Sequence, residues 1–168
     1  MAKFLAISKA GAKFDPRNCD RHIINRLNKA PTGAVDYQYI LVSDDIEGSY
    51  AELITIKDFR KVKQLLKRKI RRGTGLEIMI APCRKLDSQH IARWFEDVRD
   101  LYLFCKSSGC QLILSSGANS VQEMVSGPCL DAILKYCGIQ PEKHWESMNE
   151  WLDRVLSNRV MFNAKETS

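Results

Sequence analysis

The sequence predicts an α/β protein in which parallel strands alternate with helices. Leu76–Ala81 and Gln111–Leu114 are too apolar to be half-exposed strands, and they fit strands covered on both faces. The segment between them has its apolar residues at helical spacing. The chain has 168 residues, whereas an eight-stranded β/α barrel needs roughly 200 or more. The pattern therefore favours a reduced or incomplete parallel β/α barrel.

The first half of the chain predicts short strands and one early helix. Apolar runs bounded by turn residues place strands at Phe4–Ser8, Tyr37–Val42 and Ala51–Ile56. Asp15-Pro16 predicts a helix start, because proline is tolerated in the first turn of a helix. That helix would carry three apolar residues on one side, Ile23, Ile24 and Leu27.

The rest of the chain predicts longer helices. Asp58 is expected to cap a helix that runs to about Arg72, and Asp87 or Ser88 to cap the longest helix. Further helices are expected around Val121–Met124, over Cys129–Tyr136 and from Pro141 onward. We therefore expect a single barrel-like domain over residues 1–163 and a flexible tail over residues 164–168.

Composition and cysteine usage indicate a cytoplasmic protein without a membrane partner. No apolar run approaches the roughly 20 residues that cross a bilayer, and the N-terminus lacks the apolar region of a signal peptide. The six cysteines form no CxxC pair, and no histidine is near Cys105 or Cys110 in the sequence. This spacing favours reduced thiols over a structural zinc site.

The positive charge is concentrated in one predicted helix. Lys57–Arg72 holds nine basic residues and one acid, in a chain whose net charge is +6. Because helical neighbours three and four residues apart are nearly all positive, a bound polyanion would relieve their repulsion. Lys61 and Arg68 are therefore candidate RNA contacts. The alternative is an ordinary solvated amphipathic helix.

Most catalytic patterns are missing from the sequence. There is no GxGxxG, no GxxxxGK[ST], no GxSxG and no HExxH, and each histidine stands alone in its own predicted helix. The best acidic candidate for a magnesium role is Asp44-Asp45 at a predicted strand end, although such a pair is more often a turn or capping element. We therefore expect no catalytic residue, no metal and no cofactor on this chain.

An ordered set of motifs resembles a known family. The residues that carry the resemblance are GLEIMIAPCRKLD, the following helix with Arg93 and Arg99, LILSSGANS, and SGPCLDAILKYCGI. In order and spacing over roughly the last 90 residues, they are similar to the thirty-kilodalton protein subunit of archaeal and eukaryotic ribonuclease P, called component 3 in archaea. The chain lacks the family's arginine before Pro128, and it has one extra residue between Pro128 and Asp131.

The resemblance implies a TIM-barrel-like fold in a ribonucleoprotein endonuclease that removes the 5′ leader of precursor tRNA. In that enzyme the RNA subunit carries out the hydrolysis with magnesium. The thirty-kilodalton protein supports the RNA fold, contacts precursor tRNA only indirectly, and works beside other protein subunits, especially a small α/β partner.

The resemblance also implies which residues contact RNA. Arg84 follows the strand where the family has an arginine, and Arg99 matches the arginine of the next helix. Ser115, Ser116 and Ala118 match the serine-rich strand end, and Asp131 matches an acidic residue that caps or ties the following helix. Lys85 and Arg93 are added on charge and position alone, because basic side chains contact phosphate.

Two other functions are weighed against the RNA-binding subunit. A metal-dependent phosphoesterase of barrel fold would need ligands that converge, with His22, Asp44 and Asp45 as the candidates. A protein-assembly module would dock a partner through Trp145, Trp151 and the last helix, although tryptophans in a small protein usually belong to the core.

Overall fold

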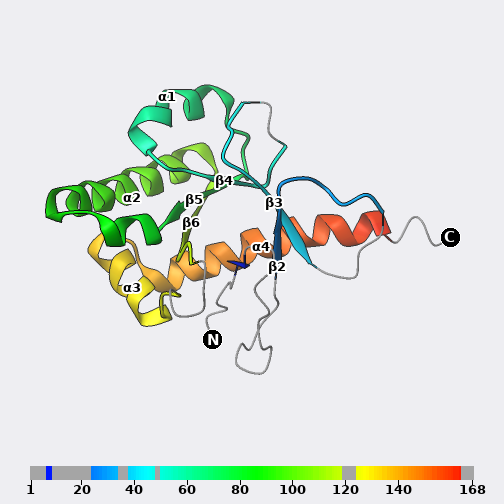
Figure 1. The fold of residues 1–168 in the computed structure, drawn as a ribbon. Coiled ribbons are helices and arrows are strands. Elements are labelled where there is room, and N and C mark those ends of the chain that lie inside the picture. Colours follow the sequence, from blue (N-terminus) through cyan, green and yellow to red (C-terminus); the bar gives the residue numbers. More distant parts are fainter. Residues whose placement is uncertain (1–6, 9–23, 34–37, 48–49, 119–123, 164–168) are drawn as a thin grey trace.

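The computed structural model of the chain describes residues 7–8, 24–33, 38–47, 50–118 and 124–163 (Figure 1). Six strands pair in parallel in the order β1-β2-β3-β4-β5-β6. They are β1 Ile7–Ser8, β2 Ile24–Leu27, β3 Tyr39–Ser43, β4 Leu53–Thr55, β5 Gly75–Met79 and β6 Gln111–Ser115. The predicted α/β class with a parallel sheet is confirmed. Each strand lies beside its neighbour in sequence, and β1 and β6 stand at the two ends of this order.

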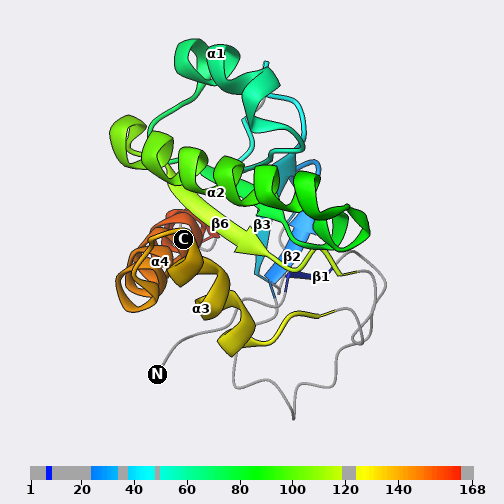
Figure 2. The same ribbon diagram turned by 90° about the vertical axis from the view of Figure 1, so that its left-hand side faces the viewer.

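Helices cover both faces of the sheet. They are α1 Phe59–Lys69, α2 Ser88–Ser108, α3 Gly127–Tyr136 and α4 Pro141–Asn163, with a short 3-10 helix, η2 Ala81–Lys85, after β5. Figures 1 and 2 show α1 and α2 on one side of the strands and α4 on the other, with α3 beside α4. α2 and α4 pack against the strands, α1 packs against α2, and α3 packs against α4, which gives the layered arrangement expected of α/β proteins.

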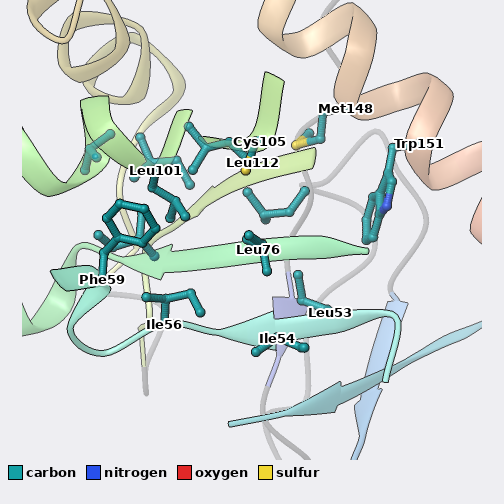
Figure 3. Packing of buried hydrophobic residues seen from close by; sticks show 14 of the residues in the cluster. Leu53, Ile54, Ile56, Phe59, Leu76, Leu101, Cys105, Leu112, Met148 and Trp151 are labelled. Atoms are coloured by element: carbon teal, nitrogen blue, oxygen red, sulfur yellow. The ribbon is translucent and has the colours of Figure 1, made fainter. Parts of the chain in front are cut away.

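The alternation of side chains along β5 divides them between the two covered faces. Leu76 and Ile78 lie on one face, and Gly75 and Glu77 lie on the other, and nearly all of this strand is buried. Figure 3 shows Trp151 of α4 beside the start of β5, so the face of Gly75 and Glu77 is the one that α4 covers. The absence of polar alternation in this run is thus explained by helices on both faces.

The helix boundaries follow local signals in the sequence. The carboxylate of Asp58 accepts a hydrogen bond from the Lys61 amide at 3.2 Å, and that of Asp87 accepts one from the His90 amide at 3.0 Å. These contacts satisfy amides that have no partner inside the helix. Gly109 ends α2 in the left-handed region at φ 68°, where glycine is favoured. Both predicted caps are therefore confirmed.

One predicted element is wrong. The early helix was expected to include Ile24 and Leu27, but Ile24–Leu27 is strand β2, which pairs with β1 on one side and β3 on the other. Apolar residues four apart fit a helix face, but pairing with two neighbouring strands overrides that local preference. The part of the predicted helix before Ile24 lies outside the described residues.

The remaining predicted elements agree in part. Strand residues are found within the runs 4–8, 37–42 and 51–56, although residues 4–6 and 37 lie outside the described part. α1 ends at Lys69, three residues before the predicted end. The last two predicted helices are confirmed. Of the helix expected around 121–124, only Met124 is described, and it is not helical. The predicted tail, residues 164–168, lies outside the described residues.

Gly75 provides a test of how tightly α4 packs on the sheet. A Cβ atom at this position would lie 2.6 Å from Cζ2 of Trp151 and 2.9 Å from Cδ1 of Leu53. The indole is held in place because its Nε1 donates a hydrogen bond to the Gly73 carbonyl at 2.8 Å. We expect Gly75→Ala to lower the free energy of unfolding by about 1–3 kcal/mol, as overpacked cores do. Urea denaturation followed by tryptophan fluorescence measures this, and an unchanged midpoint would contradict the packing described.

Candidate nucleic-acid interface

The carboxyl ends of β5 and β6 meet at one edge of the sheet. The Ile80 amide donates a hydrogen bond to the Ser115 carbonyl, and the Ala81 amide donates one to the Ser116 carbonyl, both at 2.9 Å. These bonds place η2 directly beside the end of β6. Arg84 and Lys85 are exposed at the end of η2. The structure therefore brings the basic pair and the serine-rich strand end to the same edge.

The two predicted serines are partly buried at this edge. Ser116 Oγ accepts a hydrogen bond from the Ala118 amide at 3.3 Å, and this bond stabilises the turn that follows β6. Gly117 lies at φ +61°, and a Cβ atom there would be 2.9 Å from Cβ of Met79. Ser115 Oγ is buried and has no hydrogen-bond partner in the described part of the chain. Both serines therefore belong mainly to the structure of this edge, and their hydroxyls are not fully exposed for contact with a ligand.

Arg93 and Arg99 are both exposed on α2 but do not share a face. Six residues of helix separate their directions by about 120°. Arg99 lies near Cys137 at the end of α3, close enough for its charge to act on the thiol. Burial raises the pKa of Cys137 to about 11, and the Arg99 charge opposes this rise. The predicted arginines of α2 therefore belong to two different surfaces.

The basic residues of α1 are partly neutralised by α2. Arg60 contacts Glu96 at 2.6 Å and Asp97 at 2.9 Å, and Lys63 lies 3.8 Å from Asp100. A bound polyanion was expected to relieve the repulsion among the charges of α1, but Glu96, Asp97 and Asp100 of α2 already reduce it. The charges of α1 therefore favour a bound polyanion less than the sequence indicates.

Lys61 and Arg68, the two predicted RNA contacts on α1, each interact with a residue of the same helix or its cap. Lys61 is exposed and its Nζ lies 3.2 Å from the carboxylate of the helix cap, Asp58. Arg68 is exposed and its Nε donates to the Gln64 carbonyl at 3.4 Å. Both side chains reach solvent on a helix that packs against α2.

A buried ion pair is the polar feature that sequence reasoning missed. Glu77 on β5 is fully buried, and both of its oxygens accept hydrogen bonds from Arg26 of β2, at 2.5 and 2.6 Å. The hydroxyl of Thr55 on β4 donates to the same carboxylate at 2.7 Å. The available signal was a single glutamate inside the apolar run LEIMIA. Its partner is 51 residues away, and no local pattern connects the two.

The pair keeps Glu77 ionised inside the protein. Burial raises the pKa of Glu77, but the hydrogen bonds and charge of Arg26 and the neighbouring hydroxyls together outweigh burial, and the net pKa lies below the usual value. The hydroxyls of Thr55 and Ser115 lower it further, and Ser115 contributes least because it makes no well-formed hydrogen bond. Glu77 and Arg26 thus form a fixed charge pair near neutral pH.

The acidic pair considered for a metal role has other contacts. Asp44 is exposed and its carboxylate lies 2.7 Å from Nζ of Lys57, which lowers the pKa of Asp44. Asp45 accepts a hydrogen bond from the Glu47 amide at 2.9 Å, as in a turn. Across the ranges that the structure describes, no three His, Cys, Asp or Glu side chains gather as metal ligands would. His22 lies outside those ranges.

The aromatic residues considered for partner docking belong to the core. Trp145 and Trp151 are 7% and 2% exposed. Trp145 Nε1 donates a hydrogen bond to Asp131 at 2.6 Å, so this acid ties α3 to α4. Neither tryptophan is therefore available on the outer surface of the last helix.

Comparison with known proteins identifies no family for this chain. In the described part of the chain, no helix has both the length and the apolar character needed to cross a membrane. No family model matches the sequence, and no curated protein or solved structure is similar enough to identify a relative.

Proposed function

We propose that the chain is a protein subunit of ribonuclease P that supports the catalytic RNA in removing the 5′ leader of precursor tRNA. The observation that carries the proposal is the ordered motif set, which falls on consecutive elements of the fold. The strand, the basic turn, the long helix and the serine-rich strand end are β5, η2, α2 and β6. Each motif thus falls on the type of element that the resemblance implies for it, which supports the proposal.

The parallel sheet supports a barrel-like fold for this subunit. Consecutive parallel strands joined by helices are the arrangement from which β/α barrels are built. The six strands pair in sequential order, and in this proposal they form an incomplete barrel of the TIM type. In this proposal β1 and β2 extend the sheet from the shortened N-terminal half.

In this proposal the protein binds and supports the RNA, and the RNA carries out the catalysis. Exposed Arg84 and Lys85 would contact RNA phosphates at the edge beside β6, and Arg99 would contact them beside α3. Magnesium would be bound by the RNA, and this chain would supply no catalytic group. A small α/β protein subunit would be its closest partner in the complex, which would act in the cytoplasm.

Arginine substitutions test this proposal directly. We expect Arg84→Ala and Arg99→Ala each to lower precursor-tRNA cleavage by the reconstituted complex about tenfold at moderate salt. The estimate follows from the typical strength of a charged hydrogen bond. Because both side chains are exposed, the urea midpoint of the isolated protein should stay unchanged. Cleavage assays with the RNA subunit and all protein subunits measure the effect.

A matched control separates a specific contact from general charge. Lys135 is exposed on α3 and carries the same charge, but it lies outside the predicted set. Lys135→Ala should therefore leave cleavage close to that of the unaltered protein. Equal activity in all three variants would remove Arg84 and Arg99 from the RNA interface. Failure of the protein to increase cleavage by the RNA would reject the function itself.

A further inference from the structure

A pocket lies at the opposite end of β6 from the serine-rich edge. It has a volume of about 340 Å³ and is walled by the end of α2, the Gly109–Gln111 segment and α4. Gln111 is the first residue of β6, and its Oε1 accepts a hydrogen bond from the Ser147 hydroxyl of α4 at 2.7 Å. Figure 2 shows β6 starting beside α4. The pocket therefore belongs to the amino-terminal edge of the sheet, away from Arg84.

Positive charge converges on this pocket from two helices. Its lining contains Lys106 from α2 and Lys143 and Arg154 from α4, against one acid, Glu150. Three positive charges and one negative charge leave an excess of two. Within the described residues, none of the three basic side chains forms an ion pair, whereas Arg60 and Lys63 of α1 do. These charges are thus not neutralised by the neighbouring described elements.

The basic surface continues past the rim of the pocket. The side chain of Arg72 packs over Gly109, where its Nε would be 2.7 Å from an added Cβ atom. Arg154 also reaches toward Gly73, with Nη2 at 3.9 Å from an added Cβ atom there. The end of α1 and the pocket therefore share one basic region.

A buried histidine in the wall lacks a polar partner. His144 is 4% exposed and lines the pocket, and its Nε2 has no hydrogen-bond partner among the described residues. Burial lowers the pKa of His144 to about 4, although the charge of Asp131 opposes this, so the imidazole is neutral at physiological pH. A neutral imidazole nitrogen can either donate or accept a hydrogen bond, depending on the tautomer. Buried polar atoms are rarely left without a partner in folded proteins.

We propose that this pocket binds a phosphate group, carried either by a mononucleotide or by a strand of RNA. Lysine and arginine are the side chains that bind phosphate, and a converging set neutralises its charge better than scattered surface charges do. The volume falls within the range of pockets that hold small ligands. The polar wall of Gln111, Ser147 and His144 supplies hydrogen-bonding groups beside the cations. The proposal does not depend on ribonuclease P, because any phosphate-bearing ligand would satisfy this chemistry.

Calorimetric titration of the full chain tests the site. The probes are inorganic phosphate, adenosine monophosphate and a short single-stranded RNA, each at low and high salt. The test variant is Lys143→Ala/Arg154→Ala, whose two side chains are exposed and can be removed without opening the core. We expect its affinity for the bound probe to fall at least tenfold, with the urea midpoint unchanged. Higher salt should weaken binding to the unaltered protein.

The arms of the titration distinguish the sources of the phosphate. Tighter binding of adenosine monophosphate than of RNA assigns the site to a mononucleotide, and the reverse order assigns it to an RNA strand. A second variant, Lys135→Ala, removes an exposed charge on α3 outside the pocket lining and should bind both probes as the unaltered protein does. The proposal is overturned if no probe binds at millimolar concentration. It is also overturned if the Lys143/Arg154 variant binds every probe as tightly as the unaltered protein does, a result that would leave the proposed ribonuclease P function untouched.

Discussion

Replacing Glu77 with leucine should lower the free energy of unfolding by about 3 kcal/mol or more. The substitution leaves the guanidinium of Arg26, whose side chain is 13% exposed, without its partner inside the protein. Removing one member of a buried ion pair typically costs about 3–5 kcal/mol, because the remaining charge stays desolvated. Urea denaturation at neutral pH measures the loss. The partial exposure of Arg26 places the expected value at the lower end of that range.

A double-mutant cycle shows whether the pair acts as a unit. Arg26→Met alone should also destabilise the protein, because it leaves the carboxylate of Glu77 fully buried and unpaired. The double variant Arg26→Met/Glu77→Leu should be more stable than the sum of the two single losses predicts. Thr55→Val serves as a milder control, since it removes one neutral donor and should cost about 1 kcal/mol. Strict additivity would mean that Arg26 and Glu77 do not depend on each other.

Stability should fall by an amount on the order of 3 kcal/mol as the pH drops from 6.5 to 4, because of His144 alone. Burial lowers the pKa of this imidazole from 6.5 to about 4 in the folded protein. Between these values the unfolded chain binds a proton that the folded chain does not. The contribution is therefore fully present above pH 6.5 and is lost progressively toward pH 4. Urea midpoints measured at half-unit steps between pH 8 and pH 5 follow the change.

His144→Leu is the matched variant for this measurement. It should retain most of the stability at pH 8, where the imidazole is neutral, and should flatten the dependence between pH 6.5 and pH 5. Glu77 does not interfere in this window. Its pKa is below the usual 4.5 in the folded state, so its stabilising effect is present above that value and is lost only at lower pH. An equally steep dependence in His144→Leu would assign the effect to another group.

Elements defined by nearby residues could be predicted from the sequence. Asp58 and Asp87 cap their helices because a carboxylate reaches amides only two or three residues ahead. β5 and β6 were recognisable because strands covered on both faces are mostly apolar and lack regular alternation with polar residues. The end of α2 at Gly109 follows from the left-handed backbone there, which glycine adopts without strain.

The candidate site was predictable only where it follows a strand end. Arg84 and Lys85 and the serine-rich turn meet because parallel strands place their carboxyl ends at one edge. The angle between Arg93 and Arg99 follows from helix geometry alone, but the position of Arg99 beside Cys137 depends on how α2 packs against α3. The neutralisation of Arg60 by Glu96 and Asp97 depends on how α1 lies against α2, which no pattern within either helix reveals.

The sequence by itself determined the α/β class, the helix caps and the strands whose apolar runs are continuous. Only the tertiary structure decided that Ile24–Leu27 is a strand, because its hydrogen bonds go to β1 and β3 and not to its own neighbours. The same holds for the pairing of Arg26 with Glu77 and for the basic pocket between α2 and α4. Each brings together residues that are far apart along the chain, and local preferences carry no information about such contacts.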